Sequence, residues 1–350
     1  MAFTSSASAQ QGNYVDVYYP LIRKAEISIT NHAYREALQF YKQAFSEINH
    51  SFAIDYYNAT LCELQLQAYS KAGKYAGKLM DKGVDTLFFQ SPVFEALRTH
   101  KKWDKQLQTY PAIRAKYISR IDTSLYKEIV SMVENTQSSR RRKDDYSSYR
   151  EEIRRADSAN MSRIKQIIAQ FGYPDENLIG IHDNNFFASP LSVIILRHHY
   201  QNGYTDLPDI LLEQVKRGKL SAREYAQYED INLATYKDTY FTKLDTSIII
   251  EQKLVKETIN WINQKRISIG LEPLDEWKRK ILFELNETLF LPFKQFNTVR
   301  PNGFCFLASY GVVSFIGDKT FNDQFLQQVP QPYLLQKNVL EEQGIKYLKW

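Results

Sequence analysis

Three of the six histidines of this 350-residue chain lie close together in its second half, where they could serve in proton transfer or metal binding. His182 and Asp183 fall in an expected loop, and His198 and His199 end an apolar helix predicted from Pro190 to Tyr200. Adjacent helical residues point about 100° apart, so only one of the pair can face a given metal ion. The chain has no His-Glu-x-x-His motif and no paired cysteines at zinc-binding spacing. We therefore expect no metal and no cofactor, and His199 and His182 are the candidate catalytic residues.

A nucleophile for covalent catalysis could be Cys305 or Ser309, with His199 as its base. Cys305 lies between Phe304 and Phe306, and apolar surroundings raise the pKa of a thiol and make it unreactive. The sequence contains no Gly-x-Ser-x-Gly elbow and no glycine-rich phosphate loop. The sequence therefore contains no complete catalytic motif.

The charge balance argues against nucleic acid as a partner. There are 45 Lys and Arg against 40 Asp and Glu, a net charge of +5 and an isoelectric point near 8.8, whereas nucleic-acid-binding domains are usually more basic. The densest basic run, 140–143, is followed at once by Asp144 and Asp145, which is typical of a solvated helix face. Binding of RNA or another anion by 140–155 stays an alternative. No apolar run approaches the roughly 18 residues of a membrane span, so no transmembrane segment is expected.

Residues 1–13 are expected to be a disordered tail or the remnant of a signal peptide. Ala7-Ser8-Ala9 has the small-x-small form of a signal-peptidase site, although no charged and apolar regions precede it. This site indicates a periplasmic or secreted protein; without export, the protein is cytoplasmic. Cys62 and Cys305 are expected to be free and buried, and a disulfide between them would require export.

The elements that must position these residues are mostly helical, since only 13 Gly and 11 Pro interrupt the chain. Ala37, Tyr41 and Ala44 recur at the spacing of one amphipathic helix face. Residues 14–135 are expected to form paired helices. The predicted helices comprise 14–30, a helix through 33–45, a pair within 52–80, a helix from Pro92 that ends at Pro111, and 113–133.

The helix with Tyr34, Ala37, Tyr41 and Ala44 resembles the second helix of a tetratricopeptide repeat. The resemblance covers about 70 residues and implies antiparallel helix pairs stacked side by side. Tyr34 and Tyr75, taken as equivalent, are 41 positions apart, longer than the repeat's usual length of about 34. A generic array of helical hairpins is the alternative.

A polar stretch, 136–160, is expected to connect this array to a second helical domain, 161–350. Gly172 suits the left-handed residue that ends a helix, and Ser221 and Glu224 form a capping box. The segment between Gly303 and Gly317 is aromatic and β-branched, which predicts a strand or short β-hairpin, with a buried helix as the alternative. Other helices are predicted at 161–171, 207–217, 225–231, 246–266 and 270–284.

Several landmarks of the second half recur in a fixed order. They are Gln137 and Arg140, Gly172-Tyr173-Pro174, Gly180, His199, Tyr240-Phe241-Thr242-Lys243, Arg266 and Gly270-Leu271-Glu272-Pro273. Together they resemble a bacterial family known only as a domain of unknown function, often attached to helical repeats and export signals. The resemblance implies no particular reaction. It does imply that Gln137, Arg140, Arg266 and Lys243 bind a ligand, with the three cations converging on an anion such as a carboxylate or phosphate.

The function expected from these features is protein–protein interaction or scaffolding in the bacterial cell envelope, with a protein or peptide as partner. Repeat-like helices and 24 Tyr and 20 Phe, residues suited to grooves and interfaces, favour this interpretation. The alternative is an envelope hydrolase or transferase with a pocket around His199 and Arg266. The sequence does not indicate an oligomeric state.

Overall fold

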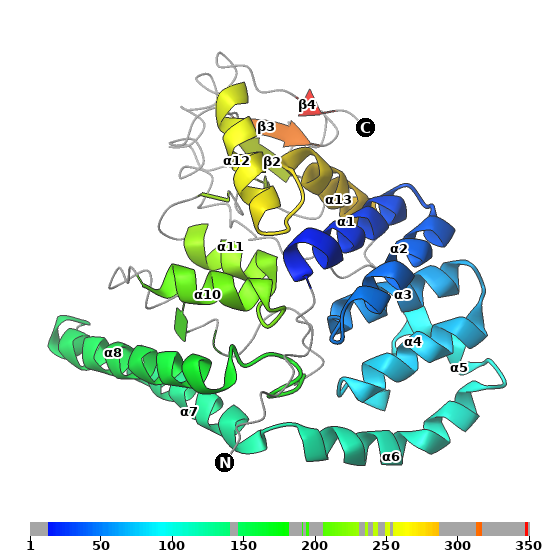
Figure 1. The fold of residues 1–350 in the computed structure, drawn as a ribbon, viewed down its shortest axis with the longest axis horizontal. Coiled ribbons are helices and arrows are strands. Elements are labelled where there is room, and N and C mark those ends of the chain that lie inside the picture. Colours follow the sequence, from blue (N-terminus) through cyan, green and yellow to red (C-terminus); the bar gives the residue numbers. More distant parts are fainter. Residues whose placement is uncertain are drawn as a thin grey trace, which may run out of the picture. The chain divides into compact units, whose positions relative to one another are not determined.

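The computed structural model confirms that the chain is mainly helical (Figure 1). It describes residues 13–140, 146–181, 191, 194–195, 206–230, 235–236, 241–243, 249–252, 255–286, 313–316 and 347–348. The expected N-terminal tail and the predicted helix 190–200, apart from isolated positions, lie outside these residues. None of the helices that the structure describes has both the length and the apolar character that crossing a bilayer requires.

The first half of the chain is a series of helices. They are η1 (Tyr14–Tyr18), α1 (Tyr19–Thr30), α2 (Tyr34–Glu47), α3 (Ala53–Gln65), α4 (Tyr69–Asp81), η2 (Thr86–Gln90), η3 (Pro92–Phe94), α5 (Glu95–Arg98), α6 (Trp103–Arg120) and α7 (Thr123–Arg140). The second half contains α8 (Tyr146–Phe171), α10 (Leu207–Lys216), α11 (Ala222–Asp230), α12 (Lys256–Ser268), α13 (Leu274–Asn286) and the strands β1 (Phe241–Lys243), β2 (Ile249–Gln252), β3 (Val313–Ile316) and β4 (Tyr347–Leu348).

The chain divides into two compact units. The first comprises Met1–Leu233 with Ile267–Leu271, and the second comprises Ala234–Arg266 with Glu272–Trp350. The described residues of the polar stretch 136–160 form the end of α7 and the first part of α8, and both helices belong to the first unit. Within it, Nδ2 of Asn160 in α8 donates to Oγ1 of Thr136 in α7 at 2.7 Å.

Helices α1 to α4 form two hairpins that close with the same backbone turn. In the first, His32 has φ 56° and the N–H of Ala33 donates to the carbonyl of Ser28 at 2.8 Å; in the second, Gln67 has φ 57° and the N–H of Ala68 donates to Glu63 at 2.8 Å. Each turn is a Schellman closure, in which a left-handed residue lets the chain satisfy the last carbonyls of the first helix.

The identical turns reveal the internal period of the array. Tyr34 and Tyr69, the first residues of α2 and α4, are 35 positions apart. The same offset relates the completely buried faces of the two helices, which consist of Ala37, Tyr41 and Ala44 in α2 and of Ala72, Ala76 and Leu79 in α4. The equivalent of Tyr34 is thus Tyr69, and the choice of Tyr75 was wrong because it ignored the turn that precedes each helix.

The long helices after the array begin and end at other residues than predicted. Pro111 lies inside α6, which continues to Arg120. Because Pro111 is exposed, the backbone carbonyl that its ring leaves unbonded can face water. The predicted helix 113–133 is interrupted at Ile121, whose ψ is 146°. Asp122 caps the N-terminus of α7, because its carboxylate accepts the N–H of Leu125 at 2.8 Å.

Four glycine-containing turns of the first unit hold tyrosine rings. A Cβ on Gly83, Gly180, Gly218 or Gly270 would lie 2.0 to 2.5 Å from an atom of a tyrosine side chain, and all four glycines have positive φ. Gly83 and Gly180 flank Tyr117, Gly218 faces Tyr14, and Gly270 faces Tyr19. Part of the tyrosine surplus therefore packs turns onto helices, where only glycine combines the backbone conformation with the close approach.

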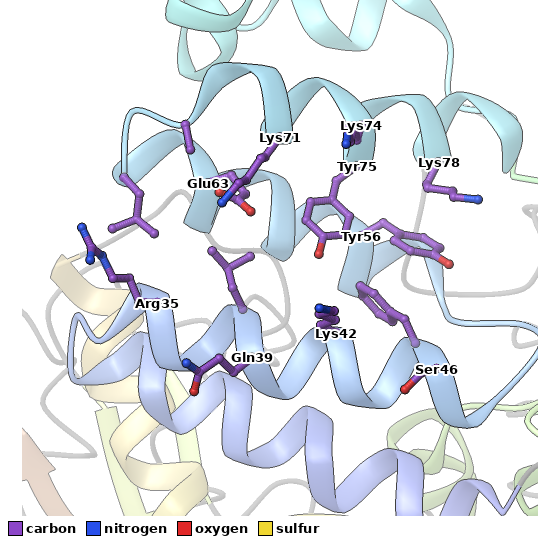
Figure 2. A pocket seen from close by; sticks show the side chains of 14 residues that line it. Arg35, Gln39, Lys42, Ser46, Tyr56, Glu63, Lys71, Lys74, Tyr75 and Lys78 are labelled. Carbon is purple, nitrogen blue, oxygen red and sulfur yellow. The ribbon is translucent and has the colours of Figure 1, made fainter.

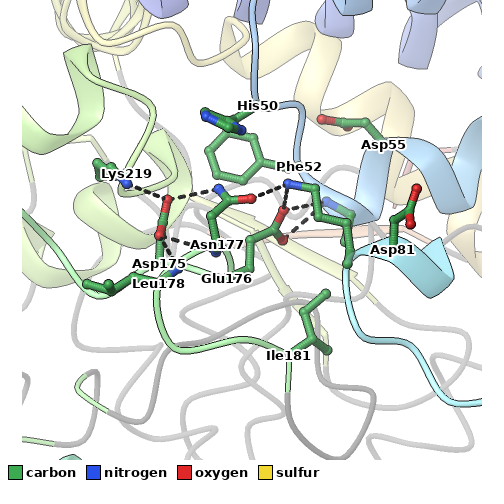
Figure 3. Close-up of polar contacts among 12 residues, drawn as sticks. His50, Phe52, Asp55, Asp81, Asp175, Glu176, Asn177, Leu178, Ile181 and Lys219 are labelled. Atoms are coloured by element: carbon green, nitrogen blue, oxygen red, sulfur yellow. Dashed lines mark hydrogen bonds and ion pairs between the residues drawn. The ribbon is translucent and has the colours of Figure 1, made fainter. Parts of the chain in front are cut away.

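The loop 172–181 is fixed to the array by a cluster of charged and amide side chains (Figure 3). The Lys82 ammonium donates to Asn177 at 2.7 Å and pairs with Glu176 at 2.8 Å, and Glu176 accepts the backbone N–H of Ala53 at the start of α3. A carboxylate at this position satisfies a free helix N–H and complements the helix dipole. The polar groups of this loop therefore stabilise the fold.

Gly172 and the capping box behave as predicted. Helix α8 ends at Phe171, Gly172 has φ 80°, and the hydroxyl of Ser221 accepts the N–H of Glu224 at 3.1 Å. The carboxylate of Glu224 also accepts hydrogen bonds from the buried hydroxyls of Tyr173 and Tyr228. Two segments of the first unit are thereby joined through one buried carboxylate.

The described part of the second unit contains a four-stranded sheet with the order β1-β2-β3-β4. Strands β1, β2 and β3 pair antiparallel, with Thr242 opposite Ile250 and Ile250 opposite Phe315, and β3 pairs with β4 in parallel. The prediction of a helix over 246–266 is wrong for its first turns, because the β-branched residues around Ile249 form β2 and α12 begins only at Lys256.

The strand predicted between Gly303 and Gly317 is described only as β3, and its partners come from distant segments. The remainder of that segment, including Cys305, lies outside the described residues.

Candidate functional site

The histidines that the sequence offered as catalytic candidates, His182 and His199, lie outside the described residues. Arg140 is the last residue of α7 and Lys243 the last of β1, and the side chains of both also lie outside the description. Convergence of these residues on one pocket therefore stays a prediction.

Arg266, the other cation of the predicted anion site, is completely buried. Its Nε donates to the carbonyl of Glu272 at 2.7 Å, its Nη1 donates to the carbonyl of Tyr236 at 2.9 Å, and its guanidinium lies 4.2 Å from the centre of the Trp277 ring. These contacts make it an anchor of the second unit. Gln137, which is half-buried on α7 in the first unit, completes the four ligand-binding candidates.

Cys62 is free and completely buried in α3, as predicted, and burial raises the pKa of its thiol. Such a thiol is unsuited to nucleophilic catalysis. Within the described ranges, no three His, Cys, Asp or Glu side chains lie close enough together to hold a metal ion.

The site that the structure does present is a groove between α2 and α4, with α3 as its floor (Figure 2). Its volume is about 1050 Å³, which is comparable to the larger known ligand pockets. The lining side chains are Arg35, Leu38, Gln39, Lys42, Phe45 and Ser46 from α2, Tyr56, Glu63 and Leu66 from α3 and its end, Ala68, and Lys71, Lys74, Tyr75 and Lys78 from α4. We call it the α2–α4 groove.

Both rims of the α2–α4 groove are basic. Lys71, Lys74 and Lys78 follow one another along α4, while Arg35 and Lys42 occupy the facing side of α2 (Figure 2). All five are exposed, and in the part of the chain that the structure describes none of them forms a salt bridge. Five cations against the single carboxylate of Glu63 give the groove lining a formal charge of +4, whereas the whole chain carries +5, so positive charge is concentrated at this site.

The floor combines aromatic rings with one buried carboxylate. Phe45, Tyr56 and Tyr75 are half-buried and in mutual contact, with ring centres 4.5 Å apart for Phe45 and Tyr56 and 6.0 Å for Phe45 and Tyr75. Glu63 is only 6% exposed, and the structure gives its carboxylate no hydrogen-bond donor among the described residues. Burial raises the pKa of Glu63, and Lys71 opposes the shift.

The sequence analysis missed this groove, although its signals were present. Lys71, Lys74 and Lys78 stand at i, i+3 and i+7, which places three cations on one helix face. Recognising the site also required knowing that α2 and α4 lie on opposite sides of one groove, which depends on how the two hairpins stack.

Comparison with known proteins supplies no name for the site: no family model, no curated protein and no solved structure matches this chain. The resemblances to the tetratricopeptide repeat and to the bacterial family of unknown function therefore stay expectations. The groove must be interpreted from its own geometry.

Proposed function

We propose that this protein binds a segment of another protein in the α2–α4 groove and acts as an interaction or scaffold protein. The observation that carries the proposal is the groove itself, in which apolar, aromatic and charged side chains from three helices line one open cavity of about 1050 Å³. Apolar contact area with polar groups around it is the usual composition of a peptide-binding surface.

The stacked hairpins support the same interpretation. The groove walls are helices whose inner faces are fully packed, so the lining side chains are held on a rigid frame before any partner arrives. The tetratricopeptide-like period of 35 is typical of arrays that present such surfaces. An envelope location fits the Ala7-Ser8-Ala9 site and remains part of the proposal.

A photo-cross-linking experiment tests this proposal. A benzophenone amino acid replaces Gln39 on the groove wall, or Lys105 on the exposed side of α6 as a control. We expect a discrete protein adduct from position 39 alone, and its loss when Leu38→Trp fills the groove in the same chain. Equal adducts at both positions, or an adduct at 39 that survives Leu38→Trp, would contradict the proposal.

A further inference from the structure

We infer that the occupant of the α2–α4 groove is a short, extended, acidic segment of a partner protein that carries an aromatic or apolar side chain. This inference rests on the proposed function and specifies the chemistry of the partner.

The basic rims select for negative charge. Lys71, Lys74 and Lys78 span about 10 Å of α4, and the lining residues of α2 from Arg35 to Ser46 span about 16 Å. Because none of the five cations has an ion-pair partner among the described residues, their charges are available to a ligand. A carboxylate placed between the rims would face lysines on one side and Arg35 or Lys42 on the other.

The length of the groove limits the size of the segment. An extended chain advances about 3.3 Å per residue, so about five residues would span the α2 rim. Successive side chains of an extended segment point to alternate sides. Some acidic side chains can then reach a rim while a neighbouring side chain packs on the rings of Phe45, Tyr56 and Tyr75.

Glu63 distinguishes a peptide from other anions. Its side chain lines the floor, its carboxylate is open to the groove, and the structure gives it no hydrogen-bond donor among the described residues, so a donor group of the ligand can replace the water that otherwise solvates it. The backbone N–H groups of an extended peptide supply donors beside its acidic side chains, whereas phosphodiester groups supply none. The rings of Phe45, Tyr56 and Tyr75 also pack edge-on or tilted against one another. They therefore do not need the stacked bases of a nucleic acid to complete their contacts.

Fluorescence anisotropy with a defined probe tests the inference. The probe is a fluorescein-labelled peptide with a Glu-Glu-Phe-Glu-Glu core between Gly-Ser flanks, and the comparison probes are its Gln-for-Glu analogue and a labelled oligouridylate. The charge-reversal variant is Lys71→Glu/Lys74→Glu/Lys78→Glu. Its control is Lys105→Glu/Lys116→Glu/Lys127→Glu, which makes the same charge change at exposed positions outside the groove.

We expect the acidic peptide to bind the wild type, to lose about a hundredfold in affinity with the charge-reversal variant, and to retain its affinity with the control within about twofold. The Gln analogue should bind more weakly, because it lacks the charges that the basic rims attract. Circular dichroism verifies that each variant is folded.

Two results would overturn the inference. The first is equal affinity for the acidic peptide and its Gln analogue, and the second is tighter binding of the oligouridylate than of the peptide. A Gln39 adduct that disappears with Leu38→Trp but persists in the charge-reversal variant would also overturn it, and that result would leave the proposed function standing. If the wild-type protein gives neither the position-39 adduct nor binding of the acidic peptide, the proposed function fails as well.

Discussion

The contact between Tyr117 and Gly180 allows a quantitative test of how the loop 172–181 is held. The Tyr117 hydroxyl accepts the N–H of Ile181 at 3.1 Å and donates to its carbonyl at 3.4 Å. An added Cβ on Gly180 would lie 2.0 Å from that hydroxyl oxygen and 3.0 Å from the ring carbon that bears it. In Gly180→Ala, the positive φ costs about 1–2 kcal/mol and the overpacking about 1–3 kcal/mol.

Tyr117→Phe alone should cost about 1–3 kcal/mol, because it leaves the buried N–H of Ile181 without a partner. Removing the hydroxyl also relieves the shortest clash, so Gly180→Ala should cost only about 1–2 kcal/mol in the Tyr117→Phe background. Equilibrium urea denaturation of the four proteins, followed by far-ultraviolet circular dichroism, gives the double-mutant cycle. We expect a coupling energy of about 1–3 kcal/mol, and additivity within about 0.5 kcal/mol would refute the reasoning.

Three further predictions concern the same unit. Gln67→Gly should raise the free energy of unfolding by about 0.5–1 kcal/mol, because glycine adopts φ 57° without strain. The control Gln43→Gly, at an exposed position inside α2, should lower it by about 1 kcal/mol, and a lower stability for Gln67→Gly would contradict the reasoning. Burial, together with the nearby charges of Asp230 and Asp209, raises the pKa of Glu229 to about 7. The protonated form of Glu229 should therefore contribute its full stability below the unfolded pKa, and this contribution should be lost as the pH rises toward 7. Urea denaturation should then show Glu229→Gln to be more stable than the wild type by about 1–2 kcal/mol at pH 8 and no more stable at pH 4. Iodoacetamide followed by mass spectrometry should leave the Cys62 peptide unlabelled in the native protein and label it fully in urea, and rapid native labelling would disprove its burial.

Local signals in the sequence predicted much of the helical architecture. The buried face of Ala37, Tyr41 and Ala44, the end of α8 at Gly172 and the cap at Ser221 each depend on residues within a few positions of one another. Helical periodicity and capping chemistry are local, so one sequence is sufficient to identify them.

The errors came from features that depend on distant partners. Pro111 was expected to end a helix that in fact continues on an exposed face, and Ile249 was expected in a helix although it pairs with Ile316 across the sheet. At such positions, contacts with distant parts of the chain override the local preference of a residue for helix or strand. The α2–α4 groove was missed for the same reason, since Arg35 and Lys71 approach one site only after two hairpins stack.

Lysine footprinting tests the central claim, occupation of the α2–α4 groove, most directly. The protein is acetylated briefly with and without the Glu-Glu-Phe-Glu-Glu peptide, and the rate at each lysine is measured by mass spectrometry. The account predicts that Lys42, Lys71, Lys74 and Lys78 react about tenfold more slowly in the complex, while Lys105 and Lys116 are unchanged. Unchanged rates at the four groove lysines under saturating peptide would contradict it.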